Sequence, residues 1–86
     1  MALVFIDGQF YRQEEAKVSV FDHGFLFGDG LFETIRAYDG YCFRLTEHIE
    51  RLYEGAELLR IKLQYSMEEV ADFVNKALSV NELTDA

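Results

Sequence analysis

Two arginines in the middle of this 86-residue chain have the side chains best suited to binding a small anion. Arg36 lies in a stretch of alternating character, residues 31–38, which predicts a strand. Arg51 lies in the helical pattern that follows, with His48 one turn before it and Gly55 one turn after it. A guanidinium group can bind a carboxylate or a phosphate through two parallel hydrogen bonds. We expect both arginines to face one shared cavity, whose opposite half comes from polypeptide outside these 86 residues.

Strand alternation assigns the side chains of residues 31–38 to two faces. One face carries two aromatic rings, a hydroxyl and a guanidinium group, from Phe32, Thr34, Arg36 and Tyr38. Such a face is typical of a pocket that holds an apolar side chain beside a carboxylate. It is also typical of a half-solvated sheet face, with Arg36 lying over Tyr38, and spacing alone favours this second interpretation.

Arg51 and His48 also have simpler interpretations. Glu47 lies four residues before Arg51, in the order that favours a surface ion pair on a helix, and the spacing by itself favours this pair over a phosphate site. His48 is typical of a structural histidine near a helix start. Gly55 would let a ligand or a loop approach this side of the helix closely.

No side chain has the setting of a catalytic group. The three lysines, Lys17, Lys62 and Lys76, lack the apolar surroundings that covalent chemistry at an amine requires. Two histidines and a single cysteine argue against a zinc site, and neither a phosphate loop of the Walker type nor a Ser-His-Asp arrangement is present. We therefore expect no catalytic residue and no metal site in these 86 residues.

The first half of the chain has the pattern of hairpins. Asp-Gly pairs between apolar runs predict tight turns at residues 7–8 and 39–40, because both turn positions tolerate positive φ. The three glycines of GFLFGDG predict a bent, closely packed loop, and residues 17–21 predict a short β segment.

The second half has the pattern of helices. One helix is expected from an N-cap at Thr46 to about Arg60, and another from a capping box at Ser66 and Glu69 to about Asn81. The tail after it is expected to fray, or to mark a chain cut from a longer protein. We predict a single α+β domain over residues 1–86, with a small antiparallel sheet of about four or five strands built from hairpins and two C-terminal helices packed on one face.

Composition excludes several classes of partner. The formal net charge of −8 disfavours a nucleic acid, because a phosphate polymer would meet a repulsive field. Cys42 has no partner for an internal disulfide, which favours a reduced, cytoplasmic setting. No apolar run approaches the roughly 18 residues of a membrane-spanning helix, so no membrane partner is expected.

A cluster of aromatic residues surrounds the glycine-rich bend. It exceeds what a small sheet is expected to cover, and an uncovered apolar patch is the usual mark of a protein interface. Its members are Phe21, Phe25, Phe27 and Phe32.

The order and spacing of DHGFLFGDGLFETIRAYDG and FRLTEHIERL resemble the N-terminal domain of class IV (fold-type IV) pyridoxal-phosphate enzymes. That group includes branched-chain amino-acid aminotransferases, D-amino-acid aminotransferases and aminodeoxychorismate lyases. The resemblance covers nearly the whole chain, and FETIRAYDG is most similar to branched-chain enzymes.

The resemblance implies roles for particular residues. Arg51 would bind the phosphate of pyridoxal 5'-phosphate, and Phe32, Thr34 and Arg36 would line the substrate pocket. Phe27 would reach into the pocket of a neighbouring subunit, which implies a homodimer through residues 25–32. The reaction implied is transfer of an amino group between a branched-chain amino acid and 2-oxoglutarate.

The resemblance also implies that much of the catalyst lies elsewhere. In the family, the lysine that links to the cofactor and most of the phosphate cradle belong to a C-terminal domain that these 86 residues do not contain. The chain alone is therefore expected to be inactive. The alternatives are a D-amino-acid aminotransferase, an aminodeoxychorismate lyase, or a non-catalytic binding domain that has kept the fold.

Overall fold

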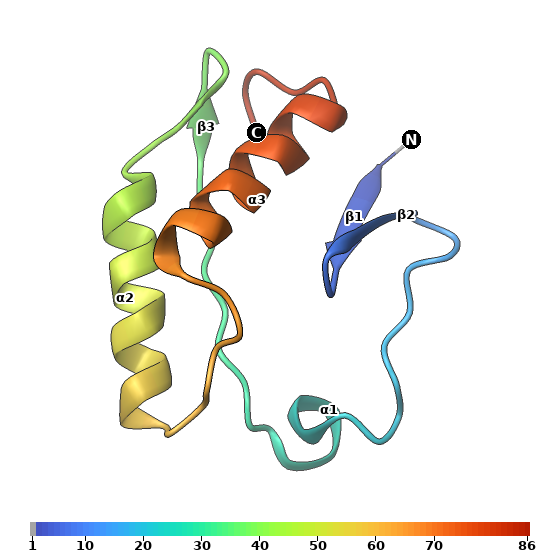
Figure 1. Cartoon of the computed structure of the whole chain (residues 1–86). Coiled ribbons are helices and arrows are strands. Elements are labelled where there is room, and N and C mark those ends of the chain that lie inside the picture. Colours follow the sequence, from blue (N-terminus) through green and yellow to red (C-terminus); the bar gives the residue numbers. More distant parts are fainter. Residues whose placement is uncertain (1) are drawn as a thin grey trace.

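The structure, a computed structural model, describes residues 2–86 as two short hairpins and three helices (Figure 1). The predicted α+β class, the antiparallel hairpins and the two C-terminal helices are confirmed. In chain order the elements are β1 (Leu3–Ile6), β2 (Gln9–Arg12), α1 (His23–Phe27), β3 (Ala37–Tyr38), β4 (Tyr41–Cys42), α2 (Leu45–Leu58) and α3 (Met67–Val80).

The two Asp-Gly turns lie where the sequence predicts them. Asp7 and Gly8 have φ values of 47° and 88° and join β1 to β2. Asp39 and Gly40, with φ values of 50° and 83°, join β3 to β4. Positive φ at both central residues gives a turn whose twist matches that of the flanking strands, so each dipeptide favours its hairpin.

The strands form two separate two-stranded sheets, not one sheet of four or five strands. Of residues 31–38 only Ala37 and Tyr38 are a strand, and residues 17–21 are not one. The free edge of β3 instead pairs with the chain's last residues. Ala37 and Ala86 exchange both backbone hydrogen bonds, at 2.8 and 3.1 Å, so the tail that was expected to fray is held.

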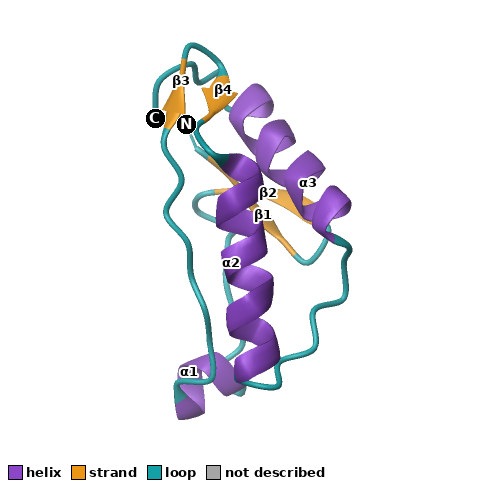
Figure 2. Cartoon of the chain, turned by 90° about the vertical axis from the view of Figure 1, so that its left-hand side faces the viewer, coloured by secondary structure: helices purple, strands orange, loops and turns teal. Residues whose placement is uncertain are grey.

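A short helix, α1, replaces the predicted glycine-rich loop. The carboxylate of Asp22 accepts hydrogen bonds from the backbone N–H groups of Gly24 and Phe25, which caps the first turn. The helix ends at Gly28, whose φ of 72° is left-handed and costs little in glycine. In Figure 2, α1 lies at the end of the molecule opposite β3, β4 and both termini.

The two long helices begin in different ways. Helix α3 has the predicted capping box, in which Ser66 Oγ accepts from the Glu69 N–H at 3.1 Å and Glu69 Oε1 accepts from the Ser66 N–H at 3.0 Å. It ends at Asn81, as predicted. Helix α2 follows Arg44, which has a φ of 53° and makes no side-chain cap, so Thr46 lies inside the helix and is not its N-cap.

Packing is centred on small residues and one aromatic stack. Ala37, Ile49 and Ala56 are the buried hydrophobic residues, and the rings of Phe5 and Phe73 join β1 to α3 with centroids 4.5 Å apart. Figure 1 shows α3 between α2 and the β1–β2 hairpin. No helix within residues 2–86 has the length and apolar character needed to cross a bilayer.

Asn81 connects the end of α3 to β1 and offers a test of this packing. Its side-chain oxygen accepts from the Leu3 N–H at 2.6 Å, and its amide donates to the carbonyl oxygens of Leu3 and Ala77 at 3.0 and 2.8 Å. We expect Asn81→Ala to lower the free energy of unfolding by about 1 to 3 kcal/mol, because partly buried backbone groups lose their partners. Urea unfolding measures this, and the exposed Asn75→Ala on the same helix is the control; equal midpoints for the two variants would contradict it.

Candidate functional site

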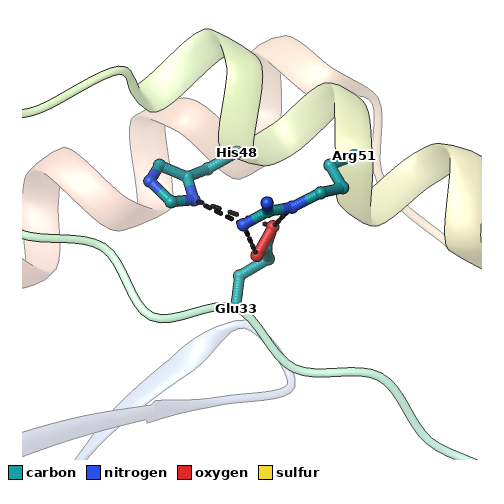
Figure 3. A network of polar contacts seen from close by, with 3 residues as sticks. All are labelled: Glu33, His48 and Arg51. Carbon is teal, nitrogen blue, oxygen red and sulfur yellow. Dashed lines mark hydrogen bonds and ion pairs between the residues drawn. The ribbon is translucent and has the colours of Figure 1, made fainter.

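A bidentate ion pair joins helix α2 to the extended segment, residues 31–36, that precedes β3. Arg51 Nε donates to Glu33 Oε1 at 2.7 Å, and one terminal nitrogen of Arg51, Nη2, donates to Glu33 Oε2 at 2.8 Å. His48, one turn earlier on α2, places Nδ1 3.4 Å from Arg51 Nη2 and 3.6 Å from Glu33 Oε1 (Figure 3). The three side chains form one polar network, with α2 supplying two of them.

The network is covered on one side and open on the other. The side chains of Glu33 and His48 are 12% and 20% exposed, whereas that of Arg51 is 69% exposed. Glu33 uses the edge of the guanidinium formed by Nε and Nη2. The N–H groups of Nη1 remain for an external acceptor, because a guanidinium carries five donors in a fixed fork.

Electrostatics keep this pair charged. The hydrogen bond from Arg51 lowers the pKa of the Glu33 carboxyl; desolvation opposes this shift, while the charge of Arg51 and the proximity of His48 add to it. The same carboxylate raises the pKa of Arg51. The guanidinium therefore stays cationic and oriented at every pH at which Glu33 is ionised.

A cavity of about 230 Å³ adjoins the open side of Arg51 and is lined by Arg44, Glu47, His48 and Arg51. Arg44, His48 and Arg51 follow one another at helical spacing along the start of α2. Two arginines gather here on a chain whose formal net charge is −8, so this is a place where an anion would meet local attraction. The arrangement can bind an anionic group, and no proton-transfer step is required of it.

The structure corrects the expected partner of Arg51. Its carboxylate is Glu33, from a neighbouring segment, and not Glu47 from the same helix. Sequence analysis missed Glu33 as a site residue, although a signal existed: it is the one charged member of the inward set that alternation selects, between Leu31 and Ile35.

Glycine at position 55 has the predicted effect of admitting a loop. A Cβ atom there would lie 3.1 Å from Cδ2 of Leu31, which is tighter than an ordinary contact. The extended segment therefore approaches α2 closely at Gly55 and is held to it by Glu33.

The predicted alternation is confirmed by burial over residues 32–38, whereas Leu31, which was assigned to the inward face, is 37% exposed. Glu33, Ile35 and Ala37 are covered, while Phe32, Thr34 and Arg36 are exposed, Phe32 by 89%. Arg36 does not line the cavity at Arg51; its guanidinium lies 5.8 Å from the centre of the Tyr38 ring. The cavity expected to be shared by the two arginines, with its opposite half from polypeptide outside these 86 residues, stays a prediction.

Phe27 lies at the end of α1 and is 69% exposed. The remaining aromatic residues of the glycine-rich bend, Phe21, Phe25 and Phe32, are exposed as well. The expectation that part of this cluster is uncovered is confirmed. Within residues 2–86, no group of three metal-ligating side chains comes together.

Comparison with known proteins gives a family and several relatives. The sequence model of the family "Amino-transferase class IV" matches residues 30–86. The "Putative branched-chain-amino-acid aminotransferase" of Methanocaldococcus jannaschii is 53% identical over 83 residues, which are 96% of this chain and 29% of that protein. The D-alanine aminotransferase of Staphylococcus haemolyticus is 49% identical over 83 residues, again 96% of this chain and 29% of that protein.

A solved structure has the same fold. The branched-chain aminotransferase of the thermophilic archaeon Thermoproteus uzoniensis, solved with norvaline, superposes with a TM-score of 0.89 at 36% identity, covering 98% of this chain and 30% of that one. A second branched-chain amino acid aminotransferase, solved with pyridoxamine 5'-phosphate, superposes with a TM-score of 0.90 at 35% identity, covering 98% of this chain and 29% of that one. The chain thus spans about 30% of the length of the relatives that it matches.

The pKa of Glu33 provides a direct test of the network. We expect an NMR titration of its carboxyl group to give a pKa below 4.5, and Arg51→Gln to move it upward, because the main cause of the shift is removed. Since the folded pKa is the lower one, the stability that this pair contributes is complete above about 4.5 and is lost as the pH falls through the folded value. Glu47→Gln is the control and should leave the titration of Glu33 in place. A normal Glu33 pKa in the unmodified chain would contradict the network.

Proposed function

The chain belongs to the amino-transferase class IV family, and from this premise we propose that it is the N-terminal part of a pyridoxal-phosphate-dependent aminotransferase. The proposed reaction transfers an amino group between a branched-chain amino acid and 2-oxoglutarate. The observation that carries the proposal is an arginine on α2 held by Glu33 with its guanidinium open to solvent, in a chain 53% identical to a relative described as a branched-chain enzyme.

The residues around Arg51 fit the phosphate group of the cofactor. A phosphate needs several donors and positive charge, and the cavity offers Arg51, Arg44 and the ring of His48, with Glu47 as the one carboxylate in its lining. When bound, pyridoxal phosphate supplies the electron sink that the amino-group transfer needs. In this proposal Arg51 binds and orients the phosphate, Glu33 and His48 orient Arg51, and no residue of this chain moves the substrate proton.

We propose that the exposed face of residues 31–38 is the substrate wall. Phe32 and Thr34 would contact the substrate side chain, and Arg36 would attract a carboxylate. The support is that alternation and burial select this face independently of the comparisons. Because the residue that links to the cofactor lies in the C-terminal domain of the family, we propose that these 86 residues alone are inactive.

The exposed aromatic cluster supports a homodimer through residues 25–32. Phe27 projects from α1, and Phe25 and Phe32 flank it in sequence, each well exposed. Exposed phenylalanines gathered at one bend are costly unless a partner covers them. A second copy of this region is the partner that we propose, with Phe27 closing the neighbouring substrate pocket.

A D-amino-acid aminotransferase is the second candidate, since the enzyme of Staphylococcus haemolyticus that is 49% identical acts, by its name, on D-alanine. The stereochemistry of the substrate is set by the walls around Phe32 and Thr34. An aminodeoxychorismate lyase would share the cofactor but needs a different pocket, and a non-catalytic domain would bind no cofactor.

Arg51 gives the first test of the proposed function. In the holoenzyme, we expect Arg51→Ala to weaken the affinity for pyridoxal phosphate by about tenfold to a hundredfold, because a charge-assisted pair of hydrogen bonds is lost. The affinity of Arg51→Lys should lie between those of the unsubstituted protein and Arg51→Ala, because an ammonium group keeps the charge but cannot make two parallel hydrogen bonds. Arg60→Ala, an exposed arginine just beyond α2, is the charge-matched control. Equal cofactor affinity in Arg51→Ala and Arg60→Ala would remove Arg51 from the site.

Substrate preference gives the second test. We expect the holoenzyme to transfer the amino group of L-leucine or L-valine to 2-oxoglutarate with a kcat/KM at least about tenfold above that for D-alanine, because the apolar wall at Phe32 favours the larger side chain. A coupled assay of glutamate formation measures this. The reverse ranking would establish the D-alanine alternative, and cofactor binding without any transfer would exclude both.

A further inference from the structure

The carboxylate that holds Arg51 comes from the segment that also carries the proposed substrate wall. Residues 31–36 run alongside α2 (Figure 2), and the members that carry the proposed wall, Phe32, Thr34 and Arg36, are exposed. Glu33, between Phe32 and Thr34, turns to the opposite side and reaches the guanidinium on α2 (Figure 3). A single ion pair therefore connects the two halves of the proposed site.

We propose that Glu33 is the positioning residue of this site, which holds Arg51 in the orientation that binds phosphate and holds residues 32–34 in the register that presents the substrate wall. This inference rests on the proposed function and adds a role that is independent of direct contact with cofactor or substrate. Glu33 acts through Arg51, because its two oxygens are both used by Nε and Nη2.

Geometry supports positioning over a purely electrostatic role. A bidentate pair at 2.7 and 2.8 Å fixes the plane of the guanidinium, whereas a single contact would leave it free to rotate. The carboxylate is 12% exposed, so few solvent molecules compete for it. A free arginine side chain has many rotamers, and ordering it before the anion arrives reduces the entropy lost on binding.

His48 completes the orientation of Arg51. Its Nδ1 lies 3.4 Å from Nη2, the same nitrogen that donates to Glu33 Oε2. Nε and Nη2 both donate to Glu33, whereas Nη1 makes no hydrogen bond to another residue within residues 2–86. The proposed phosphate contact is therefore made through Nη1.

The effect of Glu33→Gln on the affinity for pyridoxal phosphate distinguishes a positioning role of Glu33 from a role by charge alone. A negative charge next to a bound phosphate repels it, so Glu33→Gln would strengthen the binding of pyridoxal phosphate if Glu33 acted by charge alone. If Glu33 positions Arg51, the same variant weakens binding, by roughly fivefold to thirtyfold. Glu33→Asp keeps the charge but is one methylene shorter and loses the bidentate reach, so it should weaken binding as well.

The matched control is Glu47→Gln. Glu47 lines the cavity at Arg51 but is not the carboxylate that holds it, so this variant removes an equal charge without releasing the guanidinium. We expect it to strengthen cofactor binding slightly. Stronger binding in Glu33→Gln, or wild-type binding in Glu33→Asp, would overturn the positioning role.

The unsubstituted holoenzyme supplies a measurement that does not depend on the folding of a variant. We expect the pKa of the Glu33 carboxyl to rise when pyridoxal phosphate is added but to stay below its ordinary value, because the phosphate charge acts against the carboxylate while the hydrogen bonds from Nε and Nη2 remain. A return of this pKa to its ordinary value would mean that phosphate displaces Glu33, and would overturn the inference. An unaltered cofactor affinity in Arg51→Ala would instead refute the proposed function, so the two failures are distinguishable.

Discussion

The ion pair between Glu33 and Arg51 is the interaction on which the arrangement of this chain's site depends. It links two elements that no strand pairing joins, because residues 31–36 are extended without a neighbouring strand within residues 2–86. The contacts that hold this segment to α2 include the bidentate pair, the approach of His48 to Glu33, and the approach of Leu31 to Gly55. A glycine inside a helix costs about 1 kcal/mol relative to alanine, and here the close approach explains why one is present.

The value of this pair lies in geometry more than in stability. Arg51 is 69% exposed, and ion pairs with one solvent-exposed partner contribute little to folding because water and salt screen them. The covered carboxylate of Glu33 instead fixes the orientation of the Arg51 guanidinium, which lines the cavity. A chain with a formal net charge of −8 repels anions at long range, so any anion that it binds must be attracted locally. Arg44 and Arg51 provide that attraction, and Glu33 determines the direction in which one of them faces.

Local chemistry could be predicted from the sequence, and long-range pairing could not. The Asp-Gly turns and the Ser66–Glu69 capping box depend on residues within four positions of one another, and both are present as predicted. The helix cap at Asp22 is equally local, and its signal was obscured by the three glycines that follow. The division into two sheets and the pairing of the tail with β3 could not be predicted, because strand partners far apart in sequence leave no local signature.

The candidate site shows the same limit. Alternation correctly separated the faces of residues 32–38, yet helical spacing assigned Arg51 to Glu47, whereas its partner in the structure is Glu33, 18 residues away. The shared cavity for the two arginines stays a prediction, so the family is established by the comparisons and not by the geometry of Arg36 and Arg51.

The alternation of side chains along residues 31–36 explains how the proposed cofactor anchor and the proposed substrate wall stay on separate faces of one segment. Odd-numbered residues, Glu33 and Ile35, face the protein and hold the segment against α2, while even-numbered residues, Phe32 and Thr34, face outward. Because side chains of an extended chain alternate, a shift by one residue would bring Thr34 to the guanidinium and expose the carboxylate. Cofactor anchor and substrate wall would then fail together, although neither set of side chains had been altered. The register of residues 31–36 on α2 is thus a requirement of the proposed function in its own right, and the bidentate pair of Glu33 with Arg51 is the contact that would set it.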